Sequence, residues 1–409
     1  MTTPAALAPP RAPRSSARLL LDPVVGPFFF GKLLSTAGVW IHNITAAIVV
    51  FQLTGSATLV GAVSVAQFAP QLLLTPWSGA RADRADRKRQ LLAGRLVTAA
   101  GSGGLVLWIL LVGLSGTAGA AAVIVAAFVV GVGFAVGGPA LESLLPSLVR
   151  PAELPAAVAL NSMPFTLARA AGPAIGALLA TLGGPSLAFG VAAASHVVFV
   201  VVLLRLQADT GRMAPKDTSI RAGVRHLRTD PAIGALLLGT VAVGVGADPV
   251  ITLTPSIAES LGAGSQLVGA LASSFGVGAA SAFLVLGRCR RRFGSPRLTV
   301  GGLLLMAGGL TGLSLGSHPS AALLSIGVAG VGMTFALTSL TTQIQQRSPD
   351  ELRGRIMALW AVAFLGSRPV AAAVNGVTAD LVSVDIALLV VVAMVLLGAW
   401  LARPARVGR

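Results

Sequence analysis

The amino-acid sequence predicts an all-α integral membrane protein with twelve transmembrane helices, arranged as two pseudo-symmetric six-helix bundles. Three observations support this fold class. The 409 residues are 55% hydrophobic and 11% charged, whereas about a quarter of the residues in a soluble domain are charged. The apolar residues form long continuous runs instead of the short alternating segments of a membrane β-barrel. Lysine and arginine are confined to alternate connections between these runs, as the positive-inside rule requires.

Twelve apolar runs are each long enough for a membrane-spanning helix of about 20 residues. In the first half the expected spans lie near residues 27–52, 58–77, 91–112, 119–141, 157–181 and 185–205. In the second half they lie near residues 232–253, 265–287, 298–316, 320–343, 356–379 and 384–402. The predicted domains are a disordered cytosolic tail (1–26), an N-terminal bundle (27–206), a cytosolic linker (207–231), a C-terminal bundle (232–402) and a cytosolic tail (403–409).

The placement of the basic residues predicts the orientation. Those between spans all fall in even-numbered connections, in the segments 81–95, 150, 205–228, 288–297 and 347–355. The odd-numbered connections hold none. Both termini are therefore expected in the cytosol, with the chain crossing the inner (plasma) membrane many times. The net charge of +16 then reflects membrane topology, and we expect no nucleic-acid partner.

Four further features limit the architecture and chemistry. The N-terminal segment Met1–Leu21 has no apolar core followed by a cleavage site, so we expect a cytosolic tail and not a signal peptide. The linker segment Ser219–Arg228 has one apolar and one basic face and is expected to lie as a helix on the inner membrane surface. The single cysteine, Cys289, excludes an intrachain disulfide and a cysteine-based zinc cluster. No phosphate-binding loop opens a helix, so we expect no cofactor and the proton gradient as the energy source.

The most ordered polar segment is the hairpin at residues 79–91 (GARADRADRKRQL), between spans two and three. Gly79 permits two helix ends to approach closely. Asp83 suits a helix N-terminus or a cation across the interface between the halves. Arg84, Arg87 and Lys88 suit acids or anionic headgroups. Residues 287–298 (GRCRRRFGSPRL) are a degraded counterpart of this hairpin, so the two halves echo each other as repeats in transporters do.

At this hairpin the chain resembles the major facilitator superfamily, over essentially its full length. The family's loop reads roughly G-x-L-A-D-R-x-G-R-K-x-x-L, and the sequence matches it at Gly79, Ala82, Asp83, Arg84, Arg87, Lys88 and Leu91. Asp86 replaces the glycine that permits a tight turn. The resemblance implies that the hairpin, together with Arg353 and Arg355, holds the cytosolic side shut while the cavity opens outward.

Span five carries Gly172, Pro173 and Gly176, which resemble the glycine–proline motif of exporters in this superfamily. Small residues allow close helix packing, and proline bends a helix by removing a backbone hydrogen bond. Generic packing explains the motif as well. With Arg353-Gly-Arg355 and Asn375-Gly376, this segment is most similar to the branch that exports siderophores, macrolides and other drugs.

Charged residues within the spans are candidate functional groups, because a charge inside a bilayer costs at least a few kcal/mol. Asp248, Glu142 and His42 are candidates for carrying a coupling proton. Arg169 and Arg368 lie at similar depths in spans five and eleven, and are candidates for binding an anion or pairing with an acid. A permanent bridge between an arginine and an acid is the structural alternative.

Polar and aromatic residues of the spans are candidates for lining a substrate cavity. They are Trp40, Asn43, Gln67, Phe68, Gln71, Phe275, Phe335, Trp360 and Phe364. Helix packing or lipid contact is the alternative for most of them. Lys32, near the inner end of span one, is expected to extend its ammonium group to the membrane interface.

The favoured function is a secondary active exporter of an amphipathic small molecule such as a drug, an antibiotic or a siderophore. It is expected to work as a monomer by alternating access, with protons and membrane lipids as its other partners. An uptake permease for a small polar solute is one alternative. An integral-membrane enzyme or lipid-handling protein is another. Enzyme chemistry is disfavoured because the four histidines are scattered and no catalytic or metal motif is present.

Overall fold

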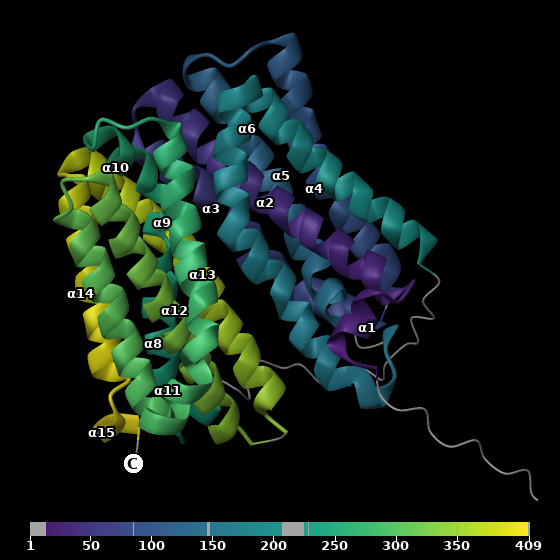
Figure 1. Ribbon diagram of the computed structural model, residues 1–409, viewed down its shortest axis with the longest axis vertical. Coiled ribbons are helices and arrows are strands. Elements are labelled where there is room, and N and C mark those ends of the chain that lie inside the picture. The colour runs from purple at the N-terminus through teal and green to yellow at the C-terminus, as the bar shows by residue number, and fades with distance from the viewer. Residues whose placement is uncertain are drawn as a thin grey trace, which may run out of the picture.

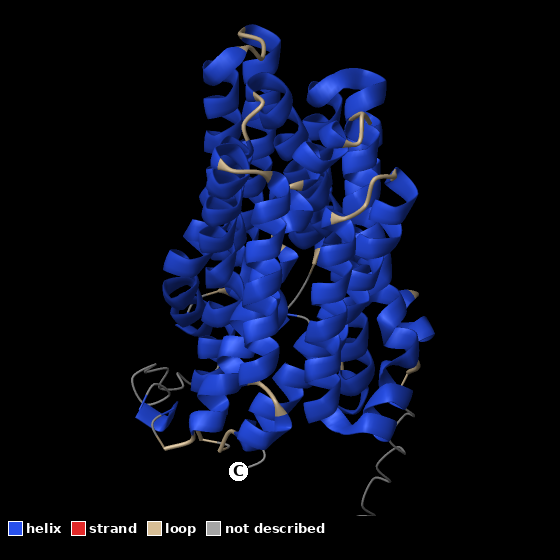
Figure 2. Cartoon of the chain, turned by 90° about the vertical axis from the view of Figure 1, so that its left-hand side faces the viewer, coloured by secondary structure: helices blue, strands red, loops and turns tan. Residues whose placement is uncertain are grey.

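A computed structural model describes residues 14–84, 86–144, 148–206, 225–227, 229–349 and 351–407. All regular secondary structure in these ranges is helical (Figure 2). Ten of the helices are long and apolar enough to cross a membrane. The predicted all-α membrane fold is therefore confirmed for the part of the chain that the structure describes.

The helices follow the predicted spans closely. In the first half they are α1 (Ser16–Leu20), α2 (Val25–Thr54), α3 (Ala57–Arg84), α4 (Arg87–Leu111), α5 (Gly116–Leu144), the 3₁₀ turn η2 (Pro151–Glu153) and α6 (Leu154–Arg205). In the second half they are α8 (Pro231–Ala247), α9 (Pro249–Thr252), α10 (Thr254–Ser260), α11 (Ser265–Ser314), α12 (Pro319–Arg347), α13 (Arg353–Leu381), α14 (Val384–Leu401) and α15 (Pro404–Val407).

Two of the ten long helices each supply two crossings. Helix α6 has 52 residues and breaks at Gly183 and Gly184, and α11 has 50 residues and breaks at Gly294. Gly184 has φ 74° and Gly294 has φ 73°, a backbone region that glycine occupies without steric cost. Since about 20 residues cross a bilayer, the ten helices provide the twelve predicted crossings.

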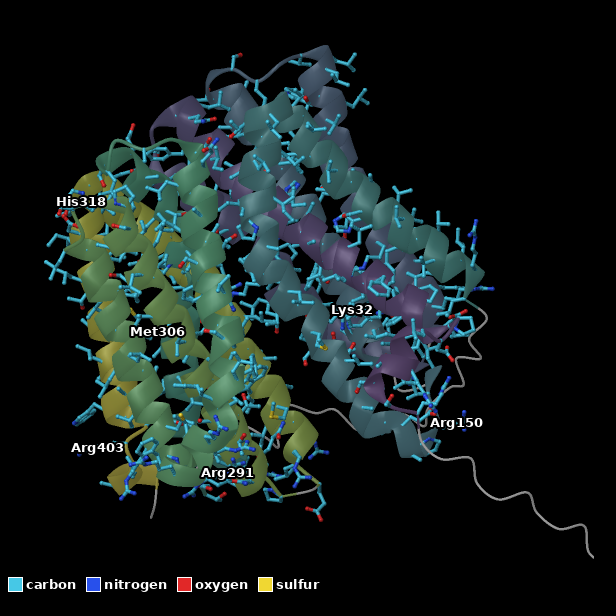
Figure 3. The ribbon with its side chains drawn as sticks, viewed as in Figure 1. Lys32, Arg150, Arg291, Met306, His318 and Arg403 are labelled. Atoms are coloured by element: carbon cyan, nitrogen blue, oxygen red, sulfur yellow. The ribbon has the colours of Figure 1, made fainter. Side chains whose placement is uncertain are left out.

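The crossings form two bundles, which we call the N-half (residues 14–206) and the C-half (residues 229–407). In Figure 1 the purple-to-teal N-half and the green-to-yellow C-half lie side by side, close at the top and apart toward the bottom. Arg150, Arg291 and Arg403 lie at the bottom in Figure 3, which we call the basic end. His318 lies at the opposite end, which we call the far end.

At the far end a carboxylate of the C-half caps a helix of the N-half. The Oδ1 atom of Asp380 accepts a hydrogen bond from the backbone N–H of Ala57 at 2.8 Å. Its Oδ2 accepts from the N–H of Thr58 at 2.9 Å and from the hydroxyl of Ser56 at 2.6 Å. The N–H groups of Ala57 and Thr58 lie at the start of α3, where backbone N–H groups have no partner within the helix and the helix dipole also favours an anion. We call these four residues the far-end latch.

The halves also meet along two helix pairs, α6 with α11 and α3 with α13. A Cβ on Gly276 of α11 would stand 2.4 Å from the carbonyl oxygen of Arg169 in α6. One turn earlier, the backbone N–H of Ala174 donates to the hydroxyl of Ser273 at 2.9 Å. Only a residue without a side chain permits this approach, so glycine fixes the contact between the halves.

The predicted disordered tail is wrong for residues 14–26. Helix α1 occupies Ser16–Leu20, and α2 begins at Val25. Asp22 accepts hydrogen bonds from the N–H groups of Val24 and Val25 at 2.9 and 3.0 Å. Residues 1–13, 207–224, 228 and 408–409, which hold the rest of the tails and most of the linker helix, lie outside the described residues, whereas 225–227 are helical.

Candidate functional site: a cavity between the two halves

A cavity of ≈ 470 Å³ lies between the halves and is called here the central cavity. Its charged and amide lining is Lys32, Glu142, Asn161 and Arg169 from α2, α5 and α6, and its aromatic lining is Phe134, Phe165, Phe283 and Phe364. Serine and threonine side chains complete its polar lining. Lys32, Glu142 and Asn161 stand near the helix ends on the basic side. The side chain of Glu142 is 62% exposed, so the cavity admits solvent toward the basic end.

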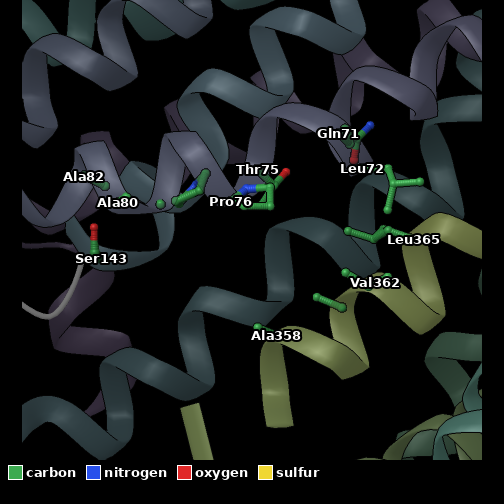
Figure 4. Close-up of a pocket in the computed structure, with 13 residues that line it drawn as sticks. Gln71, Leu72, Thr75, Pro76, Ala80, Ala82, Ser143, Ala358, Val362 and Leu365 are labelled. Carbon is green, nitrogen blue, oxygen red and sulfur yellow. The ribbon is translucent and has the colours of Figure 1, made fainter. Parts of the chain in front are cut away.

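A second cavity of ≈ 300 Å³, the side cavity, separates α3 and α5 from α13. Gln71, Leu72, Thr75 and Pro76 face Ala358, Val362 and Leu365 across it (Figure 4). Its lining is mostly apolar and includes Gly79 of the hairpin. Both cavities thus lie on the side where the halves are apart.

A buried lysine joins three helices at the mouth of the central cavity. The Nζ atom of Lys32 donates to Oε1 of Glu142 at 3.0 Å and to Oδ1 of Asn161 at 2.6 Å. Asn161 donates from Nδ2 to the other Glu142 oxygen at 2.6 Å. The side chain of Lys32 is only 6% exposed, so its expected extension to the membrane interface is wrong. The ion pair compensates the burial of its charge.

Arg169 of α6 lines the central cavity without a carboxylate partner. Its guanidinium lies 4.7 Å from the ring centre of Phe275 and 5.6 Å from that of Trp40. Its Nη2 donates to the sulfur of Met333 at 3.2 Å, and its Nε makes no hydrogen bond. No carboxylate of the described residues stands within 4.0 Å of it.

Arg368 of α13 repeats this arrangement in the C-half. Its guanidinium lies 4.8 Å from the ring centre of Phe68 and 5.7 Å from that of Phe364. Asp248 acts on it electrostatically but forms no ion pair with it. The carboxylate instead accepts from Asn375 at 2.7 Å and from Thr252 at 3.2 Å. The permanent bridge between an arginine and an acid is therefore absent at both arginines within the described residues.

His42 lies in the core of the N-half and lines neither cavity. Its Nδ1 pairs with the hydroxyl of Ser102 at 3.0 Å, while its Nε2 has no hydrogen-bond partner. His196 pairs likewise with Ser35 at 2.8 Å. Arg95, 2% exposed, packs against aromatic rings nearby. The sequence prediction did not include His196 and Arg95, although an ionisable residue within a predicted span was a sufficient signal.

The hairpin is bonded within the N-half. Arg87 donates to the carbonyl of Ala82 at 3.2 Å, and Lys88 donates to the carbonyl of Leu206 after α6 at 2.6 Å. The Oδ1 of Asp86 accepts from the N–H of Arg89 at 3.1 Å and caps α4. Asp86 thus replaces the turn-forming glycine of the family pattern with a helix cap, a role that favours aspartate.

The close helix approach expected at Gly79 is not made in this conformation. A Cβ on Gly79 would meet no atom within 4 Å, because this residue lines the open side cavity. The side chains of Asp83 and Arg84 lie outside the described residues. Arg353 donates to the carbonyl of Gln345 at 3.4 Å, and Arg355 is half-buried near the start of α13.

The remaining candidates fall into three groups. Phe364 and Gln71 each line one of the two cavities. Four aromatic residues lie behind the lining. Trp40 and Phe275 contact Arg169, Phe68 contacts Arg368, and Trp360 stacks on Phe364. Asn43, Gln67 and Phe335 line neither cavity, and Phe335 packs against Gly302 of α11. The sequence identified the residue types but not which way they point.

The small residues of span five pack against α2. A Cβ on Gly172 would stand 2.6 Å from the Cβ of Trp40, and one on Gly176 would stand 2.7 Å from Ile44. Pro173 is buried in the same stretch of α6. This contact holds Trp40 beside Arg169, so the motif supports a residue of the cavity lining from behind.

The model of the transmembrane secretion effector family, within the major facilitator superfamily, matches residues 21–408. The chain is 28% identical over 370 residues to the enterobactin exporter EntS of Shigella boydii serotype 4, covering 88% of this chain and 86% of that protein. The EntS of Escherichia coli O1:K1 matches with the same identity and coverage.

Solved transporter structures share the fold. A bacterial homologue of the iron transporter ferroportin superposes with TM-score 0.75 at 17% identity, covering 97% of this chain and 100% of that chain. A bacterial homologue of the lysosomal transporter Spinster gives TM-score 0.75 at 14% identity, covering 95% and 96%. The chain therefore belongs to the transmembrane secretion effector family of the major facilitator superfamily, and it is a multi-pass membrane transporter of small molecules and not an enzyme.

Proposed function

We propose that this protein exports an amphipathic small molecule, of the drug, antibiotic or siderophore type, by alternating access. The observation that carries the proposal is the central cavity, which combines ionic groups with aromatic rings and lies on the side where the halves are apart. Amphipathic ligands need this mixture, because apolar walls bury the body of the molecule and a few polar groups orient it. The relatedness to enterobactin exporters supports export and not uptake.

The basic end is assigned to the cytosol. Basic residues between spans fall only in the connections at that end, and the positive-inside rule orients such chains with those connections inside the cell. The central cavity then faces the cytosol, as an exporter needs for loading. In the proposed setting the chain works as a monomer in the plasma membrane, with both termini inside.

The two ends of the molecule supply the alternating gates. In the described state the far-end latch is closed, and the hydrogen bonds of Arg87 and Lys88 to other described residues stay within their own half. For the cavity to open outward, the latch must break and the hairpin must approach the C-half. We therefore assign the gate role of the hairpin, Arg353 and Arg355 to the state in which the cavity opens outward.

Glu142 is the best-placed acid for proton coupling. Its carboxylate is largely exposed in the central cavity and pairs with the buried Lys32, so solvent from the basic end reaches it in the described state. Protonation removes the charge that compensates Lys32 and loosens the contact among α2, α5 and α6. Asp248 is 3% exposed and His42 is fully buried, so both lack this access in the described state.

The export claim is tested by efflux from cells that overproduce the protein, loaded with a panel of fluorescent amphipathic compounds. Accumulation should fall relative to empty-vector cells for some members of the panel, and a proton uncoupler should restore it. Efflux that persists in the uncoupler at an unchanged rate would remove the proton-antiport claim. Inward accumulation driven by the same gradient would replace export by uptake.

A further inference from the structure

The charge balance of the central cavity leaves one cation unmatched. Lys32 and Glu142 form an ion pair and cancel each other. Arg169 is the remaining charged residue among the described residues of the lining, and its partners are two aromatic faces and a thioether sulfur. Guanidinium groups stay protonated in proteins, so this position carries a full positive charge.

The contacts of Arg169 fix its place but leave its donors underused. Cation–π contacts act on the face of an aromatic ring and accept no conventional hydrogen bond, and a thioether sulfur is a weak acceptor. The Nε donor has no partner at all, although the residue is 5% exposed. A buried guanidinium normally pairs with an anion, because leaving its donors unsatisfied is costly.

Arg368 provides an internal comparison. It is also caged by two rings, but it does not line the central cavity, and the carboxylate of Asp248 acts on it electrostatically. Its charge is thus partly balanced by the protein. Arg169 lacks a comparable acid among the described residues, so its balance must come from the cavity.

We propose that the transported molecule carries a single negative charge next to an aromatic or other flat apolar group, and that the anion binds to Arg169. This inference rests on the proposed function as an exporter and names its substrate class. A carboxylate matches the forked donors of a guanidinium. Phe165 and Phe364 of the lining supply surfaces for the apolar group. A membrane potential that is negative inside then favours outward movement of the anionic substrate.

The test compares two probes that differ in one charge, 1-naphthoate and 1-naphthamide. The full chain is purified into nanodiscs of phosphatidylcholine, so that no lipid headgroup carries a net charge, and probe affinity is measured by quenching of tryptophan fluorescence. The naphthoate should bind at least 10-fold more tightly, as expected for one charge-assisted hydrogen-bonded pair. Equal affinities, or no binding of naphthoate at millimolar concentration, would overturn the proposal.

Variants assign the preference to Arg169. Arg169→Gln should bind both probes alike, and Arg169→Lys should keep part of the preference. Arg292→Gln is the matched control, because Arg292 also rests on an aromatic ring, at 5.6 Å from Phe293, but on the exposed surface at the basic end. It should keep the full preference. A preference that survives in Arg169→Gln protein with a normal elution profile would contradict the assignment.

One further arm separates a solute from a lipid. Phosphatidylglycerol is added to the nanodiscs while naphthoate binding is measured. Naphthoate affinity that is unchanged supports a soluble anion as the ligand. If the wild-type protein binds naphthoate in pure phosphatidylcholine discs but loses this affinity when phosphatidylglycerol is present, an anionic lipid is the ligand. That result overturns the substrate proposal. Gradient-driven efflux of neutral compounds alone would overturn the charge assignment while leaving the export proposal standing.

Discussion

Ion pairs of one arginine, Arg14, hold residues 14–22 against the rest of the N-half. Glu153 accepts hydrogen bonds from the Nε and Nη2 of Arg14 at 2.7 and 2.9 Å, and Arg14 also pairs with Asp22. The hydrogen bonds from Arg14 lower the pKa of Glu153 from its ordinary 4.5 to about 2. A carboxyl group whose pKa is lowered by folding stabilises the folded form above its ordinary pKa and loses that contribution as the pH falls toward the folded value.

We therefore expect residues 14–24 to detach from the start of α6 as the pH falls. A spin label at Ala17→Cys, an exposed position of α1, in a Cys289→Ser background should become mobile between about pH 4.5 and pH 2. In Glu153→Gln the label should be mobile at neutral pH as well, because the charge is gone. A wild-type label with the same mobility throughout this range would show that the contact does not hold the segment.

Which residues could be predicted depends on whether their partners are near in the sequence. The spans, the basic connections and the internal charges followed from composition and hydropathy, because these are local properties of the chain. The pairing of Lys32 with Glu142 joins residues 110 positions apart and left no local signal. In a membrane protein both the core and the lipid face are apolar, so periodicity does not tell which face of a span points inward.

At the scale of whole elements, the far-end latch joins α13 to the start of α3. Helix capping by a carboxylate contributes about 1 kcal/mol, and this site is exposed to solvent, which limits its strength. Losing it should shift the equilibrium toward the state open at the far end by about fivefold. Asp380 stands near the end of span eleven in the sequence. Its capping role could not be predicted, because the capped helix belongs to the other half and the contact is a tertiary one.

Distances between spin labels test the latch. Cysteines replacing Ser115 and His318, exposed at the far end of the two halves, are labelled in a Cys289→Ser background and measured by double electron–electron resonance. Asp380→Ala should raise the population with the longer distance. Glu259→Gln, which changes another exposed acid of that end, should leave the distribution unchanged. An identical distribution in Asp380→Ala and wild-type protein would remove the latch from the mechanism.

At the scale of the whole molecule, two similar bundles meet at the far end and part toward the basic end (Figure 1). Twelve crossings and two similar halves were predictable, because repeat loops and hydropathy mark them. The conformation was not, because the same sequence must support both end states of a transporter and the free-energy difference between such states is only a few kcal/mol. The cavities and the closed far-end latch therefore describe one of the two end states of the transporter.

The central claim is that proton movement through Glu142 drives substrate export. Its most direct test uses proteoliposomes with an imposed pH gradient, loaded with a compound identified by the efflux panel. Wild-type protein should move the compound against its concentration gradient, and Glu142→Gln should lose this uphill movement but retain exchange of labelled for unlabelled compound. Asp248→Asn should retain both. Uphill transport by Glu142→Gln at the wild-type rate would contradict the account.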